Sequence, residues 1–180
     1  MKLKDGREVE IRELEKEDAG AVIAYLNEVA GETNFLSFGK NEFTLTLKEE
    51  EDFIQGMKES NHSLLLGAFA EGRMIACCNV SGLSGLKNRY RHRASLGISI
   101  RKEYWNQGLG RYLMELLIDY ARKHSVINML ELEVSADNDR GIHLYQSLGF
   151  QMVGEYKRFF LVGDTYCNAY YMQLDLIDKK

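Results

Sequence analysis

The sequence predicts a single-domain α/β protein in which a mixed, mostly antiparallel, twisted sheet of six to seven strands is flanked by about four helices. Three observations lead to this fold class. Residues 1–180 suit one domain with its own core, and 45% of them are hydrophobic. Several short apolar segments follow one another across glycine turns, which indicates antiparallel hairpins. Another pair of apolar segments is separated by a long amphipathic helix, a connection that requires parallel strands.

The N-terminal part of the chain contains one expected strand and two expected helices. Around Val9, apolar and charged residues alternate, which indicates a half-buried strand. Apolar residues recur at helical spacing from Lys16 to Ala30. A second helix is expected from about Lys48 to Ser60, and Thr46 followed by Glu49 forms the capping-box pattern at its start.

The middle of the chain predicts three strands. Ser63 to Ala70 and Met74 to Leu83 are apolar, and Glu71-Gly72 between them is typical of a tight hairpin turn. Ser84 to His92 mixes glycine and basic residues and is expected to form a loop. Ala94 to Ile100 is the third strand of this group.

The C-terminal half predicts helices and strands in alternation, ending in a hairpin. The expected elements are a helix from Gly108 to Lys123, a strand from Met129 to Val134, a short helix from Asn138 to Leu148, and strands from Gln151 to Val162 and from Thr165 to Leu176. Gly149 is expected to end the short helix as its C-terminal cap, and Gly163-Asp164 to join the last two strands.

The net charge of the chain and its lack of long apolar segments indicate which classes of partner to expect. A formal net charge of −4 argues against a nucleic-acid binder, because such proteins need a basic face to release counterions. The same charge suits a cationic substrate, although many enzymes are mildly acidic for solubility alone. No segment approaches the roughly 20 apolar residues that span a bilayer, and Met1 to Glu10 lacks the apolar core of a signal peptide. We therefore expect no membrane partner.

The cysteines and histidines predict neither disulfides nor a metal site. The three cysteines are an odd number, and Cys77 and Cys78 are adjacent in an apolar run, where we expect them to belong to the core. The four histidines show no metal-ligand spacing. A reducing, cytoplasmic location follows as the simplest interpretation.

The segment that precedes the long helix carries a chemical signal. Helix N-termini expose unpaired N–H groups and a partial positive charge, so they bind phosphate. Gly108 and Gly110 have no Cβ and let an anion approach the backbone, while Arg111 adds a positive charge in the first turn. Asn106 or Gln107 is expected at the helix start. The alternative is a loose turn that binds nothing, since the segment matches neither the dinucleotide fingerprint nor the Walker motif.

A second group of residues, taken together with this segment, indicates a family resemblance. Gln107-Gly108-Leu109-Gly110 before an amphipathic helix, then Asn138, Leu144-Tyr145 and Leu148-Gly149-Phe150, resembles the GNAT superfamily of N-acetyltransferases. The resemblance covers nearly the whole chain, includes the element order, and points to the ribosomal-protein and polyamine acetyltransferase branch. It implies acetyl-CoA as cofactor and transfer of its acetyl group, by direct attack in a ternary complex, to a primary amine of a small molecule or peptide. Homodimers are common in this family.

The resemblance also implies which residues bind the cofactor. Backbone amides from Gln107 to Arg111 hold the pyrophosphate of coenzyme A, and the pantetheine arm pairs with the strand before the loop, which a bulge at Gly97 would splay from its neighbour. The implied cofactor-binding residues are Ile98, Ser99, Ile100, Asn106, Gln107, Gly108, Leu109, Gly110, Arg111, Asn138 and Tyr145. The sequence departs from the family pattern at Trp105, where glutamine or arginine is usual.

Tyr145 is assigned from the same resemblance, whereas the oxyanion donor and the candidate base are assigned from the expected positions of the strands. Tyr145 matches the tyrosine near the sulfur and is expected to give a proton to the leaving thiolate, and a strand amide near Ile98 to stabilise the oxyanion. Glu133 is the candidate general base, with a solvated or salt-bridged carboxylate as its alternative explanation. Glu32, Glu42 or a water chain without a dedicated base remain open, because the strand lacks the glutamate that many relatives carry near Ser95.

The acceptor side is expected in the segment between the first two helices. Glu32, Phe35 and Phe38 are the candidate substrate-binding residues, in a slot with an aromatic side and an acidic rim. The alternative is that the aromatic residues only cover the core. Two other functions stay open: a catalytically silent acyl-CoA sensor of the same fold, and a peptide-recognition module that uses an open sheet edge and has no coenzyme affinity.

Overall fold

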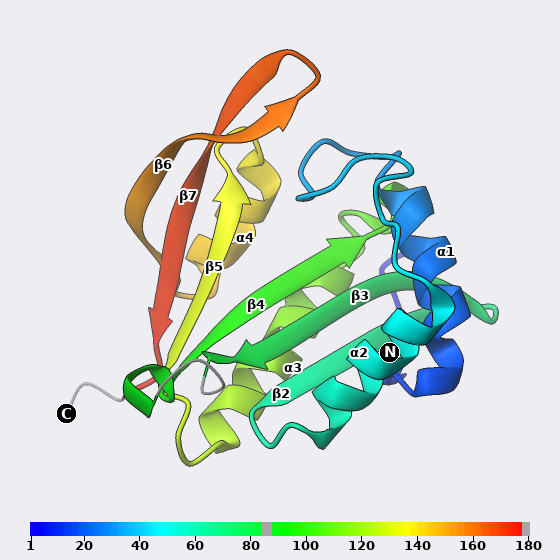
Figure 1. Cartoon of the computed structure of the whole chain (residues 1–180), viewed down its shortest axis with the longest axis horizontal. Coiled ribbons are helices and arrows are strands. Elements are labelled where there is room, and N and C mark those ends of the chain that lie inside the picture. The colour runs from blue at the N-terminus through cyan, green and yellow to red at the C-terminus, as the bar shows by residue number, and fades with distance from the viewer. Residues whose placement is uncertain (84–87, 178–180) are drawn as a thin grey trace.

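Seven strands form one sheet in the order β1-β2-β3-β4-β5-β7-β6 in the computed structural model (Figure 1), which describes residues 1–83 and 88–177. The strands are β1 (Glu10–Glu13), β2 (Ser63–Ala70), β3 (Arg73–Gly82), β4 (Arg93–Ile100), β5 (Met129–Ser135), β6 (Gln151–Val162) and β7 (Thr165–Asp175). The predicted mixed sheet and the predicted order of elements are confirmed. The first part of the predicted loop, residues 84–87, lies outside the described residues.

Within the described part of the chain, four α-helices flank the sheet, where about four were predicted. They are α1 (Ala19–Val29), α2 (Leu47–Glu59), α3 (Leu109–Lys123) and α4 (Asp139–Ser147), and short 3₁₀ turns precede several elements. The first helix begins later than its apolar pattern, because residues 16–18 form a 3₁₀ turn in which the Asp18 carboxylate accepts a hydrogen bond from the Glu15 amide at 2.8 Å. No helix in the described ranges has both the length and the apolar character needed to cross a bilayer.

The helices divide the core into two clusters, one on each face of the sheet. On one face α1 and α2 bury Tyr25 and Ile54 against β2 and β3. On the other face α3 buries Leu113 and Leu117 against β3, β4 and β5. A fully buried leucine or isoleucine contributes about 2 kcal/mol to stability, so the two clusters fix the helices on the sheet.

The turn residues adopt the conformations that their types favour. Thr46 and Glu49 form the complete capping box at the start of α2. Glu71 and Gly72 both have positive φ, at 50° and 75°, as a tight hairpin turn requires. Gly149 follows α4 with a φ of 96°, which is the left-handed conformation of a helix C-cap. Local sequence therefore determines where these elements end.

The single parallel pair in the sheet is short. β4 pairs with β5 only from Arg93 to Ser95, opposite Met129 to Glu131, whereas every other neighbouring pair is antiparallel. Beyond these three residue pairs the two strands diverge, and Figure 1 shows the resulting V between β4 and β5. The chain between α1 and α2 passes near the wide end of this V. The predicted splayed parallel pair is confirmed.

Candidate active site

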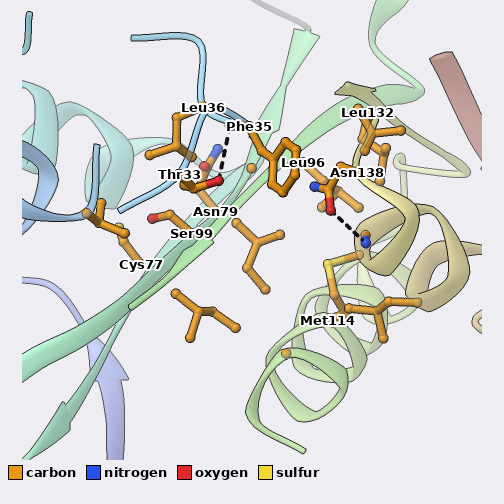
Figure 2. A pocket seen from close by; sticks show the side chains of 18 of the residues that line it. Thr33, Phe35, Leu36, Cys77, Asn79, Leu96, Ser99, Met114, Leu132 and Asn138 are labelled. Atoms are coloured by element: carbon orange, nitrogen blue, oxygen red, sulfur yellow. Dashed lines mark hydrogen bonds between the residues drawn. The ribbon is translucent and has the colours of Figure 1, made fainter. Parts of the chain in front are cut away.

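The divergence of β4 and β5 opens a cavity of about 970 Å³. Its walls come from both sides of the sheet: the N-terminal end of α3 and the face of α4 on one side, and α1, α2 and the segment between them on the other. In Figure 2, Cys77 and Ser99 lie to one side of Phe35, and Leu132 and Asn138 lie to the other. The cavity therefore passes through the gap in the sheet and joins the side lined by α3 and α4 to the side lined by α1 and α2.

The loop before α3 presents unpaired backbone amides to this cavity. Asn106 and Gly108 have positive φ, at 62° and 88°, and the residue between them does not, so successive amides turn toward one side as in an anion-binding nest. No side chain of a described residue caps the helix. None of the amides from Asn106 to Arg111 donates a hydrogen bond to a described residue. The arrangement can bind a phosphate or pyrophosphate group.

The predicted start of α3 was wrong by one or two residues. Gly108, and not Asn106 or Gln107, occupies the N-cap position, because the chain needs a left-handed residue immediately before the helix. The Gln107 side chain points to the N-terminal segment, where its Oε1 accepts a hydrogen bond from the Asp5 amide at 3.2 Å. Leu109 is fully buried in the core. These two residues can therefore contribute to an anion site only through their backbone amides.

Two arginines flank the amides. Arg111 donates from Nη2 to the Ser147 hydroxyl at 2.7 Å, which fixes the start of α3 against the end of α4. Arg140 donates from Nη1 to Oδ1 of Asn106 at 3.2 Å, and its guanidinium lies over the Trp105 ring at 4.5 Å. Trp105, at a position where the family pattern has glutamine or arginine, therefore holds the Arg140 guanidinium beside the loop. The sequence analysis did not single out Arg140.

On β4, the residues Ile98, Ser99 and Ile100 line the cavity. The predicted bulge at Gly97 is wrong: β4 keeps an unbroken register with β3 from Ala94 to Ile100. The strand pair opens because β5 turns away, and no extra residue is inserted. Gly97 instead leaves room for a neighbouring side chain, since a Cβ there would lie 2.5 Å from Oδ1 of Asn79 on β3 and would displace it.

On α4, Asn138 and Tyr145 both line the cavity. Asn138 is the N-cap, and its Oδ1 accepts a hydrogen bond from the Gly141 amide at 3.0 Å. Tyr145 is only 8% exposed and packs edge-on against Phe150 with 6.0 Å between ring centroids. Burial raises the pKa of the Tyr145 phenol to about 12, so the hydroxyl is protonated at all physiological pH values.

The two sides of the cavity hold the remaining predicted residues, with one exception. Glu133 lines it from β5 with an exposed side chain, and Phe35 and Phe38 line it from the segment between α1 and α2. Glu32 does not line it: its Oε2 accepts a hydrogen bond from the Lys102 amide at 2.6 Å, and its Oε1 lies 3.6 Å from Nη1 of Arg101. The structure therefore does not bring Glu32 to the cavity, because this carboxylate holds the end of β4.

Two side chains line the cavity that the sequence analysis did not place there. Cys77, expected in the core, lines the cavity from β3, and its neighbour Cys78 is the buried one. Burial, with a smaller contribution from the Glu50 charge, raises the pKa of the Cys77 thiol to about 12. Glu50 lies on the buried face of α2 and also lines the cavity.

The comparisons with known proteins agree with this geometry. The family model described as the acetyltransferase (GNAT) family matches residues 11–150, which is more than half of the chain. The chain belongs to the acetyltransferase (GNAT) family. It is thus an N-acetyltransferase that uses acetyl-CoA, and the catalytically silent alternative receives no support.

Curated relatives of this acetyltransferase include N-alpha-acetyltransferase RimI of Mycobacterium tuberculosis, 33% identical over 116 residues, which are 64% of this chain and 68% of that protein. Spermidine N(1)-acetyltransferase of Escherichia coli is 36% identical over 84 residues, 46% of this chain and 44% of that protein. The alanine N-acetyltransferase of ribosomal protein bS18 from Escherichia coli is 51% identical over 53 residues, 29% of this chain and 35% of that protein.

Solved structures extend the likeness to nearly the whole acetyltransferase. A GNAT-family acetyltransferase from Streptococcus pneumoniae has a TM-score of 0.88 and 34% identity, covering 94% of this chain and 99% of that one. Spermidine N-acetyltransferase from Vibrio cholerae, solved in complex with CoA and spermine, has a TM-score of 0.75 and 18% identity, covering 93% and 95%. The second likeness concerns the fold alone.

Proposed function

We propose that this acetyltransferase binds coenzyme A on the α3–α4 side of the cavity and the acceptor amine on the α1–α2 side. The observation that carries the proposal is the row of unpaired amides from Asn106 to Arg111 at the start of α3, a segment in which Asn106, Gly108, Gly110 and Arg111 line the cavity. Arg111 and Arg140 add positive charge beside them. A diphosphate is doubly charged, and this combination of amides and guanidinium groups is the chemistry that binds it.

The residues further along the cavity suit the rest of the cofactor. From Leu96 to Ile100, the side of β4 that faces β5 has no strand partner among the described residues. The backbone of Ile98, Ser99 and Ile100 can therefore pair with the amide groups of an extended pantetheine arm, apart from the Ile100 carbonyl, which accepts a hydrogen bond from Nε1 of Trp105 at 2.8 Å. Gly110 lets the start of α3 pack closely here, because a Cβ there would lie 3.3 Å from Cδ1 of Ile100 and 3.4 Å from Cδ2 of Leu144. Asn138 and Tyr145 line the path from α4.

The cofactor, when bound, supplies an acetyl thioester to the amine. The backbone of β4 near Ile98 would donate a hydrogen bond to the developing negative charge on the acetyl oxygen. Tyr145 would donate a hydrogen bond to the departing sulfur. A full proton transfer from Tyr145 is unfavourable, because a phenol with a pKa of about 12 is a weaker acid than a thiol, whose ordinary pKa is about 8.5. Glu133 lies on β5 at the edge of the same cavity and is a further candidate base.

The acceptor is a primary amine with an apolar or aromatic part, either a small molecule or a peptide N-terminus. Its slot would be formed by Phe35, Leu36 and Phe38 from the segment between α1 and α2, by Phe53 of α2, and by Cys77 of β3. The curated relatives act on several amines, among them the alanine of a ribosomal protein and spermidine, which supports an amine acceptor in general.

We place the activity in one domain that comprises residues 1–180, in the cytoplasm, without a nucleic-acid or membrane partner. The three free cysteines suit a reducing compartment. A homodimer remains a prediction from the family resemblance.

The test is a thiol-release assay with acetyl-CoA and a panel of alkylamines, polyamines, aminoglycosides, amino acids and peptides with free N-termini. We expect release of free CoA that depends on one class of amine, with the acetylated product identified by mass spectrometry. Binding of acetyl-CoA without amine-dependent release across the whole panel would contradict the proposed function.

A further inference from the structure

A carboxylate interrupts the buried face of α2. The buried residues of this helix are Glu50, Ile54 and Met57, spaced by four and three positions along one side. Ile54 and Met57 belong to the apolar cluster between α1, α2 and the sheet. Glu50 occupies the corresponding position one turn earlier and is only 2% exposed, where an apolar residue would stabilise the fold better.

Glu50 differs from the other acidic residues of α2 in having no partner. Glu49 bonds to Thr46, Glu51 and Asp52 lie near Lys48, and Glu59 accepts from Gln55. No described residue donates a hydrogen bond to the Glu50 carboxylate or forms an ion pair with it, and burial raises its pKa. Among the described residues, every fully enclosed side-chain oxygen has a hydrogen-bond partner, so the Glu50 carboxylate must open on the cavity that it lines.

The carboxylate lies on the side of the cavity opposite to the phosphate-binding cations. Its electrostatic neighbour is Cys77 on β3, which pairs across the strands with Ser99 of β4. The Tyr25 hydroxyl of α1 donates to the Ser99 hydroxyl at 2.9 Å. The described lining contains one other carboxylate, that of Glu133 on β5, whose side chain is exposed. Negative charge in the buried, α1–α2 part of the cavity is thus concentrated in a single side chain.

We propose that Glu50 binds the ammonium group of the acceptor and takes a proton from it, and that the acceptor is a primary monoamine with an apolar or aromatic body. The inference rests on the proposed function and assigns its base and substrate class. A single buried carboxylate matches a single ammonium, and the surrounding walls of Leu26, Leu36 and Phe53 match an apolar substituent. A polyamine would leave its second charge without a partner on this side.

The proton and electron balance is simple. The ammonium gives one proton to the Glu50 carboxylate, and the lone pair so formed makes the carbon–nitrogen bond to the acetyl carbon. The carbon–sulfur bond breaks, and its electrons stay on sulfur, which receives the second proton that the nitrogen loses. Glu50 then releases its proton to solvent. Burial favours the first transfer, because it disfavours both the ammonium and the carboxylate relative to the neutral amine and acid.

The first test compares Glu50→Gln with Glu51→Gln, the same substitution at the next position of the same helix. We expect Glu50→Gln to lower kcat/KM for a basic monoamine by roughly 100-fold, in the range of general-base effects, with an unchanged Kd for acetyl-CoA. Glu51→Gln, whose side chain does not line the cavity, should behave like the wild type. Equal activity of Glu50→Gln and the wild type would overturn the role of Glu50 and leave the proposed function intact.

The second test varies the basicity of the acceptor at constant size, with a series of monoamines that carry increasing numbers of fluorine atoms beside the amine carbon. A weakly basic amine reaches the site already neutral and needs no base. The defect of Glu50→Gln should therefore shrink along the series. A defect of constant size would show that the carboxylate positions the substrate without taking its proton, and would overturn the base assignment.

The third test measures the thermal stability of the unliganded protein. We expect Glu50→Gln and Glu50→Leu to raise Tm, since each removes a buried carboxylate without a partner, while both lower activity. A lower Tm with weaker acetyl-CoA binding in both variants would mark Glu50 as structural and overturn the proposal. Faster turnover of spermidine than of every monoamine by the wild type would overturn the substrate class. If the wild type acetylated no amine at all, the proposed function itself would fail.

Discussion

At the scale of single residues, the chemistry of Tyr145 follows from its burial. With a pKa of about 12, the phenol stays protonated and acts as a hydrogen-bond donor to sulfur more readily than as a full acid. We therefore expect Tyr145→Phe to lower kcat about tenfold, at or below the lower end of general-acid effects, with little change in KM for acetyl-CoA. Steady-state thiol release measures both constants, and an unchanged kcat would remove the hydroxyl from the reaction.

Cys77 is the second residue with a chemical consequence. A thiol whose pKa is raised to about 12 has a negligible thiolate fraction at neutral pH, so Cys77 is not a nucleophile even though it lines the cavity. We expect Cys77→Ala, which only shortens one wall of the acceptor slot, to lower kcat/KM by less than about tenfold, far less than the loss of a nucleophile would. Incubation with acetyl-CoA alone, followed by mass spectrometry, should detect no acetylated enzyme. An acetyl adduct that Cys77→Ala abolishes would contradict direct attack by the amine.

The residues that sequence analysis found and missed differ in a physical way. The glycine loop, Asn138 and Tyr145 belong to a contiguous pattern whose meaning is local, and the structure brings them to one cavity. Glu50 lies in an acidic run at a helix start, where solvated carboxylates are usual, and only the spacing to Ile54 and Met57 could have indicated its burial. Glu32 is the reverse case, since its hydrogen bond to a distant backbone amide has no local signal.

At the scale of elements, α2 depends on its capping box. The Thr46 hydroxyl accepts from the Glu49 amide at 3.3 Å, and the Glu49 carboxylate accepts from the Thr46 amide at 2.8 Å. Thr46→Ala should cost about 1 kcal/mol of unfolding free energy, because one helix amide loses its acceptor. Urea unfolding monitored by circular dichroism measures the loss, and Thr46→Ser should restore most of it. Equal stability of Thr46→Ala and the wild type would contradict the cap.

The loop before α3 depends on the left-handed conformation of Gly108. A Cβ there meets only Cε of Lys4, at 4.0 Å, so space is not limiting, but a φ of 88° strains any other residue by about 1–2 kcal/mol. Gly108→Ala should therefore raise the Kd for acetyl-CoA roughly tenfold by shifting the amides away from the nest geometry. Isothermal titration calorimetry measures this change.

Gly56→Ala is the matched control for that substitution. Gly56 lies inside α2 with an ordinary helical φ, and a Cβ there would meet no atom within 4 Å beyond the backbone of its own helix. We expect Gly56→Ala to stabilise the fold by about 0.5–1 kcal/mol and to leave acetyl-CoA binding unchanged. Unchanged binding in Gly108→Ala would mean that the loop amides do not hold the diphosphate.

The elements themselves were predictable because each has a clear hydrophobic period and a turn residue at its end. The prediction of a bulge at Gly97 failed for a physical reason. The separation of β4 from β5 depends on the path of β5, which no residue within β4 indicates. The side chain of Asn79, on the adjacent strand, explains the glycine. A contact between side chains on paired strands leaves no periodic trace in the sequence of either strand.

At the scale of the whole molecule, ligand binding should stabilise the fold. At one hundred times its Kd, acetyl-CoA should add about 2.7 kcal/mol to the free energy of unfolding, by mass action alone. Thermal unfolding monitored with and without acetyl-CoA tests this, with free adenine as a control that lacks the diphosphate. No shift with acetyl-CoA would favour a peptide-recognition module over the coenzyme site.

The three-residue contact between β4 and β5 has one more consequence. Unfinished strand edges are hazardous on a protein surface, because they invite pairing with other chains. Here an unfinished edge runs through the interior of the protein, with helices packed on both faces of the sheet and the chain between α1 and α2 near its wide end. An extended, amide-bearing molecule such as a pantetheine arm can pair with this edge inside the cavity, whereas the folded surface of another protein cannot reach it. The fold thus leaves unpaired backbone groups of β4 accessible to an extended ligand, while their interior position protects them from pairing with other protein chains.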